Sequence, residues 1–221
     1  MADFWKDIIK CPFCSNEYSF INVKSSAVKV ESYDADLKPN YKGINPSLYG
    51  VVSCPKCKFS FLVKDKDTLL KNLNPSRTSK IHDYLDSIDE EDRFEINNSE
   101  NKSLTFYEKQ LVVSSEIYAI MEKPFEVARL LLRLAWSYRE KKDDSKELKI
   151  LIDVMKICER SFEKAVSDND AIFSLFFQGY VNYRLGNKKQ AIIAFDKLVS
   201  KYKNSRNQYI KAAKTIRGEI K

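Results

Sequence analysis

Two short stretches decide the fold of this chain, CPFC at residues 11–14 and CPKC at residues 54–57. Two cysteines separated by two residues can turn back onto one metal ion, because the tight loop aims both sulfurs in the same direction. Two such loops, brought together by strands, complete a tetrahedron. The pattern therefore predicts one structural Zn²⁺ held by four thiolates, those of Cys11, Cys14, Cys54 and Cys57.

Two other uses of these thiols stay open, a redox dithiol and a set of buried thiols without a metal. A closed shell of four protein ligands leaves no open coordination position, so water activation by this metal is not expected. In both loops the glycine that often follows the second cysteine is absent. Ser15 and Lys58 occupy those positions, which predicts slight strain in the loops.

Composition points to a globular chain without a membrane span. The 221 residues are 43% hydrophobic and carry a net charge of +7. No apolar run approaches the roughly 18 residues that cross a membrane. The start, MADFWKDIIK, has acidic residues where a secretion signal has positive charge. We therefore expect a soluble cytoplasmic protein, in which paired cysteines are more often metal ligands than disulfides.

Three zones predict the domain organisation and an α+β fold class. Residues 1–70 are rich in Tyr, Phe, Val and turn formers, which is typical of a small β-rich, zinc-ribbon-like head. Residues 71–104 form a polar, acidic linker or cover with a possible short helix near 80–88. Residues 105–221 have helical spacing throughout. The strands expected in the head are 18–23, 27–33, 49–54 and 59–63.

The helical zone begins with a predicted capping box, in which Thr105 and Glu108 satisfy free backbone N–H groups. The stretch 172–205 then matches tetratricopeptide spacing in part, with Gly179 and the pair Leu185–Gly186 as its main markers. A fainter copy lies 44 residues earlier, and its extra length is expected at residues 140–147. An ordinary helical hairpin is the alternative interpretation.

The cysteine pairs, the intervening stretch YDADLKPNYKGINPSLYGVVSCPKC and the stretch LLLRLAWSYRE together resemble a bacterial family of uncharacterised proteins. In that family a split zinc-ribbon-like head precedes tetratricopeptide-like helices. The resemblance covers most of the chain and implies this architecture, without implying an activity. Besides the cysteines, it is most specific at Asp34, Asp36, Tyr41, Asn45, Pro46 and Tyr49 and at Ala135, Trp136, Tyr138, Arg139 and Glu140.

Few other residues of the sequence indicate a catalytic or metal-binding site. Asp34 and Asp36 could form a cation site or a catalytic pair, but two carboxylates are few for calcium. We favour hydrogen bonding within the loop near the metal, where Tyr41, Asn45 and Tyr49 also lie. The single histidine, His82, is expected on a polar surface helix, and no phosphate loop or nucleophile signature occurs. We therefore do not expect an enzyme.

The helical zone offers a candidate partner site instead. In a tetratricopeptide unit the first helix of each hairpin lines a concave groove, and aromatic side chains beside arginine suit a peptide with a carboxylate. The alternative is that these side chains only pack the helices. The predicted groove residues are Arg129, Trp136, Arg139, Phe176, Tyr180, Tyr183 and Arg184.

Three functions follow from these patterns. The first is a non-catalytic zinc-binding protein that binds another protein or peptide through the helical groove. The second is nucleic-acid binding, favoured by residues 170–221, which hold eleven basic and three acidic residues. The third is a thiol redox role. The basic and aromatic residues of the head that suit nucleic acid are Lys38, Tyr41, Lys42, Tyr49, Lys56, Lys58 and Phe59.

Overall fold

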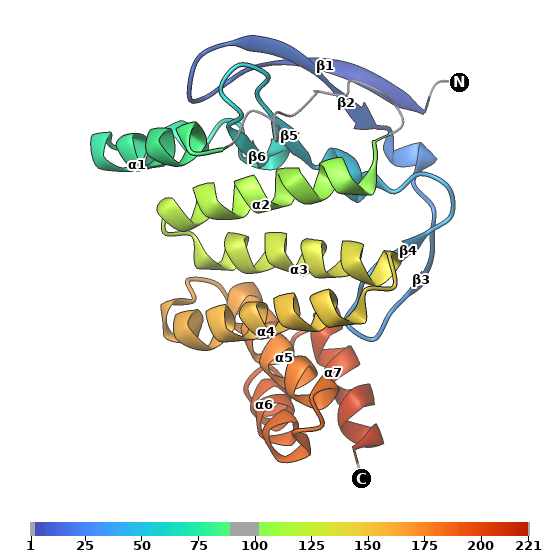
Figure 1. Cartoon of the computed structure of the whole chain (residues 1–221). Helices are drawn as coiled ribbons and strands as arrows, with labels where there is room; N and C mark the ends of the chain where they lie inside the picture. The colour runs from blue at the N-terminus through green and yellow to red at the C-terminus, as the bar shows by residue number, and fades with distance from the viewer. Residues whose placement is uncertain (1–2, 89–101, 221) are drawn as a thin grey trace. The chain divides into compact units, whose positions relative to one another are not determined.

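The computed structural model describes residues 3–88 and 102–220 (Figure 1). By contact density the chain divides into two compact units, and the division falls inside a helix, after Leu130. The N-terminal unit comprises Met1–Lys29 and Tyr41–Leu130, and the helical unit comprises Val30–Asn40 and Leu131–Lys221. The domain boundaries expected at residues 70 and 105 stay predictions. Residues 89–101 of the expected linker lie outside the described residues.

The N-terminal unit contains short antiparallel hairpins followed by helices. Two-stranded sheets need a further layer for stability, and helix α2 packs against the β5–β6 hairpin to provide it (Figure 1). The elements are β1 (Phe4–Lys10), β2 (Glu17–Val23), β5 (Val51–Ser53), β6 (Ser60–Leu62), α1 (Pro75–Asp86), α2 (Leu104–Ile120) and the start of α3 (Pro124–Glu140).

Strand β1 was not among the predicted strands. It pairs antiparallel with β2 along its whole length, from Phe4 opposite Val23 to Lys10 opposite Glu17. Its side chains do not alternate cleanly, since Trp5 is 46% exposed and Ile8 is 65% exposed. Its pairing with β2 decides its conformation, so the pattern within β1 itself is weak.

Helix α2 begins at Leu104, directly after its N-cap residue Ser103. The Ser103 hydroxyl accepts a hydrogen bond from the Phe106 N–H, which makes Ser103 the N-cap. The predicted capping box at Thr105 is therefore wrong by two residues. The expected short helix near 80–88 is present as α1, which starts earlier because Asn74 caps it.

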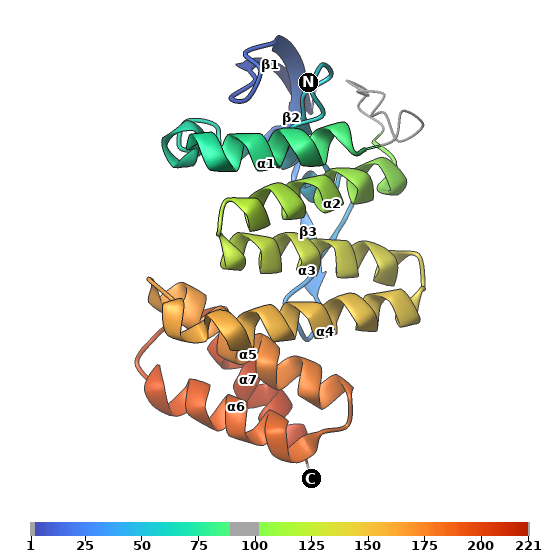
Figure 2. The ribbon, with the colours of Figure 1, turned by 60° about the vertical axis from the view of Figure 1, so that its left-hand side comes forward.

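The helical unit consists of one small hairpin and a run of helices joined by short connections (Figure 2). The α+β fold class is confirmed by the N-terminal hairpins and the seven α-helices of the described residues. Helix α5 packs on both α4 and α6, and α7 packs on α5 and α6. The elements are β3 (Val30–Tyr33), β4 (Pro39–Tyr41), the end of α3, α4 (Asp144–Ser161), α5 (Asp168–Arg184), α6 (Lys188–Lys201) and α7 (Gln208–Glu219).

Helices α5 and α6 form a close hairpin for two reasons visible in the sequence. A Cβ atom at Gly179 would lie 2.5 Å from the Phe195 ring, so only glycine permits this approach. Gly186 has φ +77° in the turn, a conformation that glycine adopts without steric cost. Both glycines therefore account for a close helical hairpin.

The helices also repeat at a constant offset of 44 residues. Helix α3 matches α5 at both ends, and the start of α4 matches the start of α6. Each pair is joined by a turn of three residues, 141–143 and 185–187. The predicted insertion at 140–147 is therefore wrong, because the extra length lies beyond the turn, in the longer α4 and the connection to α5. Within the described residues, no helix combines the length and apolarity that a bilayer span requires.

Candidate metal centre and a buried ionic site

The two cysteine loops have the same backbone structure. In the first loop, Cys11 donates its N–H to the Asn16 carbonyl at 2.8 Å, and the Ser15 N–H returns to the Cys11 carbonyl at 3.0 Å. These bonds close a tight turn that directs both sulfurs to one side. The second loop repeats both bonds at 2.9 Å, between Cys54 and Phe59 and between Lys58 and Cys54.

The residue after the second cysteine of each loop adopts the left-handed conformation. Ser15 has φ +61° and Lys58 has φ +62°. For an L-residue other than glycine this conformation costs about 1–2 kcal/mol. The strain expected from the missing glycines is therefore present in both loops.

The four cysteine sulfurs gather into one cluster. All four lie within 4.8 Å of one another. Two close contacts join the two loops, with Cys11 Sγ 3.7 Å from Cys57 Sγ and Cys14 Sγ 3.6 Å from Cys54 Sγ. A tetrahedron with metal–sulfur bonds of about 2.3 Å has edges of about 3.8 Å. The donor set and its spacing therefore fit a tetrahedral metal ion.

The surroundings of the sulfurs explain why a cation would stabilise the cluster. The hydrogen bond with Cys54 raises the pKa of Cys11 to about 12, and the hydrogen bond with Cys11 raises the pKa of Cys57. The hydrogen bonds with Cys11 and Cys57 lower the pKa of Cys54. Without a cation the sulfurs cannot all ionise, because like charges at this distance repel.

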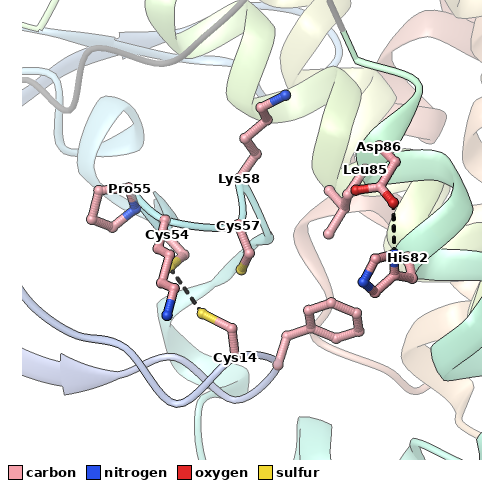
Figure 3. Close-up of a pocket in the computed structure, with 10 residues that line it drawn as sticks. Cys14, Cys54, Pro55, Cys57, Lys58, His82, Leu85 and Asp86 are labelled. Carbon is pink, nitrogen blue, oxygen red and sulfur yellow. Dashed lines mark hydrogen bonds and ion pairs between the residues drawn. The ribbon is translucent and has the colours of Figure 1, made fainter. Parts of the chain in front are cut away.

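The cluster is buried on one side and opens on the other into a pocket of about 550 Å³. Cys11 and Cys54 are buried, whereas Cys14 and Cys57 are half-buried. Figure 3 shows the sulfurs of Cys14, Cys54 and Cys57 on one wall of the pocket and His82 of helix α1 on the opposite wall. Asp86 Oδ2 lies 2.8 Å from His82 Nδ1. The pocket gives a metal ion a path to the sulfurs.

A second cluster of functional groups lies inside the helical unit. The guanidinium of Arg139 uses all five of its N–H groups on three carboxylates. It binds Asp36 through two parallel bonds of 3.0 and 2.7 Å, Asp34 at 2.6 Å, and Glu147 at 2.9 and 2.7 Å. Asp36 is fully buried and Glu147 is 1% exposed. Arg139 therefore joins the hairpin β3–β4 to α3 and α4.

Further polar contacts extend this cluster. The indole N–H of Trp136 donates to Asp36 at 2.9 Å. Arg184 donates to Glu147 and to the Tyr180 hydroxyl, both at 3.1 Å. Lys38 pairs with Glu140 at 3.2 Å. We call Trp136, Arg139, Glu147, Tyr180 and Arg184 the Arg139 site, and we call residues 30–40 the acidic hairpin.

The loop residues of the head divide between two environments. Asp34 and Asp36 were expected to bond within the loop near the metal, and each does accept a bond from its own loop, Asp34 from the Asn40 amide at 2.7 Å and Asp36 from the Lys38 N–H at 3.4 Å. Both carboxylates also bind Arg139 of the helical unit, which was not expected. Asn45 instead caps a short 3₁₀ helix by accepting from the Ser47 N–H. Tyr49 is buried against the Phe4 ring, and Tyr41 is half-buried.

The predicted groove residues are mostly occupied within the chain. Phe176 is fully buried among aromatic rings, so its placement in an open groove is wrong. Tyr180 is 3% exposed, and Tyr183 is half-buried with its hydroxyl 3.4 Å from Glu219. Arg129 belongs to the N-terminal unit and pairs with Glu126 at 3.0 Å. Trp136, Arg139 and Arg184 do share one site, as described above.

Sequence reasoning missed Glu147 and the setting of His82. Glu147 is the carboxylate that binds both Arg139 and Arg184. In the sequence it ends a run of charged residues typical of an exposed surface, so only its position in the first turn of α4 could have indicated a buried role. His82 lies on a surface helix as expected, with its side chain 65% exposed. Its place opposite the cysteines depends on tertiary contacts that no local pattern indicates.

The head residues proposed for nucleic acid do not form an open patch. Lys38 is 6% exposed and paired, and Phe59 and Tyr49 are buried. Lys58 donates to the Ile88 carbonyl at 2.9 Å. Of that set only Lys42 and Lys56 are exposed.

These features define an α+β protein with a four-cysteine cluster suited to a metal ion. The chain belongs to the bacterial family described as "Uncharacterized protein conserved in bacteria (DUF2225)", whose model matches residues 4–220. An uncharacterized protein of Borreliella burgdorferi is 26% identical over 170 residues, which is 67% of this chain and 58% of that protein. The chain thus matches less than two thirds of that relative's length. No solved structure matches.

Proposed function

We propose that this chain is a non-catalytic zinc-binding protein in which one Zn²⁺ joins the two cysteine loops. The observation that carries the proposal is the set of four sulfurs within 4.8 Å on two loops of the same backbone structure. Four thiolates form a closed shell, which is typical of structural zinc. Iron also accepts four thiolates, so the identity of the metal has to be measured.

Metal analysis tests this proposal directly. Purified protein is expected to contain one zinc per chain by native mass spectrometry and elemental analysis. Cys11→Ser or Cys54→Ser should lose the metal. Cys158→Ser is the matched control, since Cys158 is buried in α4, outside the cluster, and its replacement should leave the zinc content unchanged. Metal-free wild-type protein would contradict the proposal.

A redox role makes a different prediction for the same sample. It needs accessible thiolates of low pKa. Alkylation of the native protein, followed by mass spectrometry, should leave the four clustered cysteines unmodified while zinc is bound. Rapid alkylation of Cys14 and Cys57 with the metal in place would favour the redox role. Bound, unreactive thiolates also agree with a reducing cytoplasm, which we propose as the location.

We further propose that the helical unit is a protein-interaction module built from tetratricopeptide-like hairpins. The repeat of 44 residues, the close approach at Gly179 and the matched turns support this interpretation. Stacked hairpins bury one face on their neighbours and present another to partners. In this role the metal holds the head together, and the helical unit supplies the binding surface.

Nucleic-acid binding is a second candidate, favoured by one observation. Helices α6 and α7 expose several lysines, while Asp196 and Glu219 are their only acidic residues. Because such binding releases counterions, affinity for single-stranded oligonucleotides should fall steeply as salt rises. No binding at 50 mM salt would remove this candidate. The exposed lysines are Lys188, Lys189, Lys197, Lys201, Lys211 and Lys214.

A further inference from the structure

We propose that the Arg139 site is a receptor for an extended acidic segment, and that the acidic hairpin occupies it as an internal ligand. The partner would present two carboxylates with one residue between them, as Asp34 and Asp36 do. This inference rests on the proposed interaction role of the helical unit and names the chemistry of its partner.

The hairpin is held by charge more than by apolar burial. All four residues of β3 are exposed, including the apolar side chains Val30 and Tyr33, at 41% and 55%. Its anchors are Asp34, Asp36 and Lys38, each bound to a group of opposite charge on α3. A two-stranded hairpin is marginally stable alone. Its conformation therefore depends on docking, as that of a bound peptide does.

The backbone of the hairpin turn supports the same conclusion. The Asp34 N–H donates to the Lys38 carbonyl, and the Leu37 N–H donates to the Asp34 carbonyl, both at 2.9 Å. Leu37 has φ +65°, which a leucine rarely adopts. Such a conformation persists where surrounding contacts impose it. Here those contacts are the ionic bonds to Arg139.

The receptor side is preorganised without the hairpin. Glu147 binds Arg139 and Arg184 together, and Arg184 also binds the Tyr180 hydroxyl. These bonds would keep both guanidinium groups in place if the hairpin left. The site would then hold two positive charges and one negative charge, an excess that favours a dicarboxylate. The Trp136 indole N–H adds a donor at the position of Asp36.

Tethering explains why an external partner must compete. A segment joined by a short linker acts at an effective concentration of about 1 mM or more. When the acidic hairpin occupies the site, the apparent affinity for any other segment falls in proportion to the fraction of molecules whose site is empty. Weakening the hairpin should therefore uncover binding that the wild-type chain hides.

The test uses the full-length zinc-loaded protein and a fluorescent synthetic peptide of residues 28–42. The Asp34→Asn/Asp36→Asn variant should bind this peptide at least tenfold more tightly than wild type, as measured by fluorescence anisotropy. A peptide with asparagine at both positions should not bind. Asp67→Asn/Asp83→Asn is the matched control, because both carboxylates are exposed, and it should behave as wild type.

Equal, weak binding by all proteins would overturn the inference and make the hairpin a fixed part of the fold. Zinc content measured on the same samples separates this failure from failure of the proposed metal role. If the double variant does not fold, hydrogen exchange of the wild type decides. The amides of Asp34 and Leu37 should exchange at least 100-fold faster than those of Phe176 and Phe177 in α5. Exchange of both groups at one rate would mean that the hairpin opens only when α5 unfolds, which would make it a fixed part of the fold.

Discussion

At the scale of single residues, the backbone conformations of two residues other than glycine show how strongly the two cysteine loops are constrained. Ser15 and Lys58 follow the second cysteine of each loop and have nearly the same positive φ. Neither residue type favours that conformation. The matching hydrogen bonds at Cys11 and Cys54 impose it, so the strain results from aiming two sulfurs at one point.

Replacing Ser15 by glycine should therefore stabilise the protein. Glycine removes a steric cost of about 1–2 kcal/mol, and its extra freedom in the unfolded chain returns about 0.5–1 kcal/mol. The expected gain is about 0.5–1 kcal/mol in urea unfolding. Lys56→Gly is the control, because Lys56 is exposed and has no positive φ. It should destabilise the protein, and a gain in both variants would contradict the strain argument.

At the scale of elements, the helical unit is organised by close approach within hairpins. The α5–α6 pair depends on Gly179, over which the Phe195 ring lies. Lys142 in the α3–α4 turn has φ +59°, and it takes the place of Gly186 in the α5–α6 turn. The same turn is thus built once with glycine and once without it, because the packed helices fix the path of the chain.

Gly179→Ala should destabilise the helical unit by about 1–3 kcal/mol. The added methyl group would require the buried Phe195 ring to move, and overpacking of this kind has that cost. Gly218→Ala is the matched control in α7, where a Cβ meets nothing within 4 Å. It should stabilise the helix by about 0.5–1 kcal/mol. Thermal unfolding followed by circular dichroism measures both, and equal effects would show that the approach at Gly179 is not tight.

The acidic hairpin should respond to pH through Asp34. Burial raises the pKa of this carboxyl, but hydrogen bonds from Asn40 and Arg139 outweigh it and lower the pKa below its usual value of 3.8. A depressed pKa contributes stability that is present above that value and is lost as the pH falls below it. The difference in stability between wild type and Asp34→Asn should therefore be largest above pH 4 and shrink toward pH 2.

The fluorescence of Trp136 reports this difference in stability, because its indole N–H donates a hydrogen bond to Asp36 in the same site. Trp5 is 46% exposed, and replacing it with phenylalanine leaves Trp136 as the single tryptophan. Urea unfolding of the two proteins in that background, followed by fluorescence at pH 6, 4 and 3, gives the measurement. A difference that stays constant down to pH 3 would show that the charge of Asp34 does not stabilise the hairpin.

At the scale of the whole molecule, the two units are expected to depend on different interactions. The two cysteine loops lie in the N-terminal unit, and the Arg139 site lies in the helical unit. The short hairpins β1–β2 and β5–β6 are joined through the cysteine cluster, whereas α5, α6 and α7 share a core of aromatic and aliphatic side chains. Loss of the metal should thus affect one unit first.

Chelation at neutral pH tests this expectation. Removal of the metal should unfold the hairpins, since structural zinc sites supply folding energy directly. Hydrogen exchange should then rise in β2 and β5 while the amides of α5 stay protected. Restoring zinc should restore protection, and magnesium should not. Simultaneous loss of protection in β2 and α5 would show that the metal stabilises the chain as one cooperative unit.

The sequence alone determined the local features of this protein. The spacing of Cys11 and Cys14, and that of Cys54 and Cys57, predicts the matched loops because two intervening residues are enough to form the turn. The helices from residue 104 onward follow from apolar periodicity, and the α5–α6 approach follows from Gly179. Each of these depends on residues close together in the chain, or on a repeating pattern within one element.

Only the tertiary structure decided what the charged residues do. Asp36 and Arg139 are 103 residues apart, so no local pattern could pair them. The aspartates were expected to bond within their own loop, and Arg139 was expected to line an open groove. Instead, Arg139 binds both aspartates inside the helical unit. A buried charge requires a partner of opposite sign, and the fold determines which residue provides it.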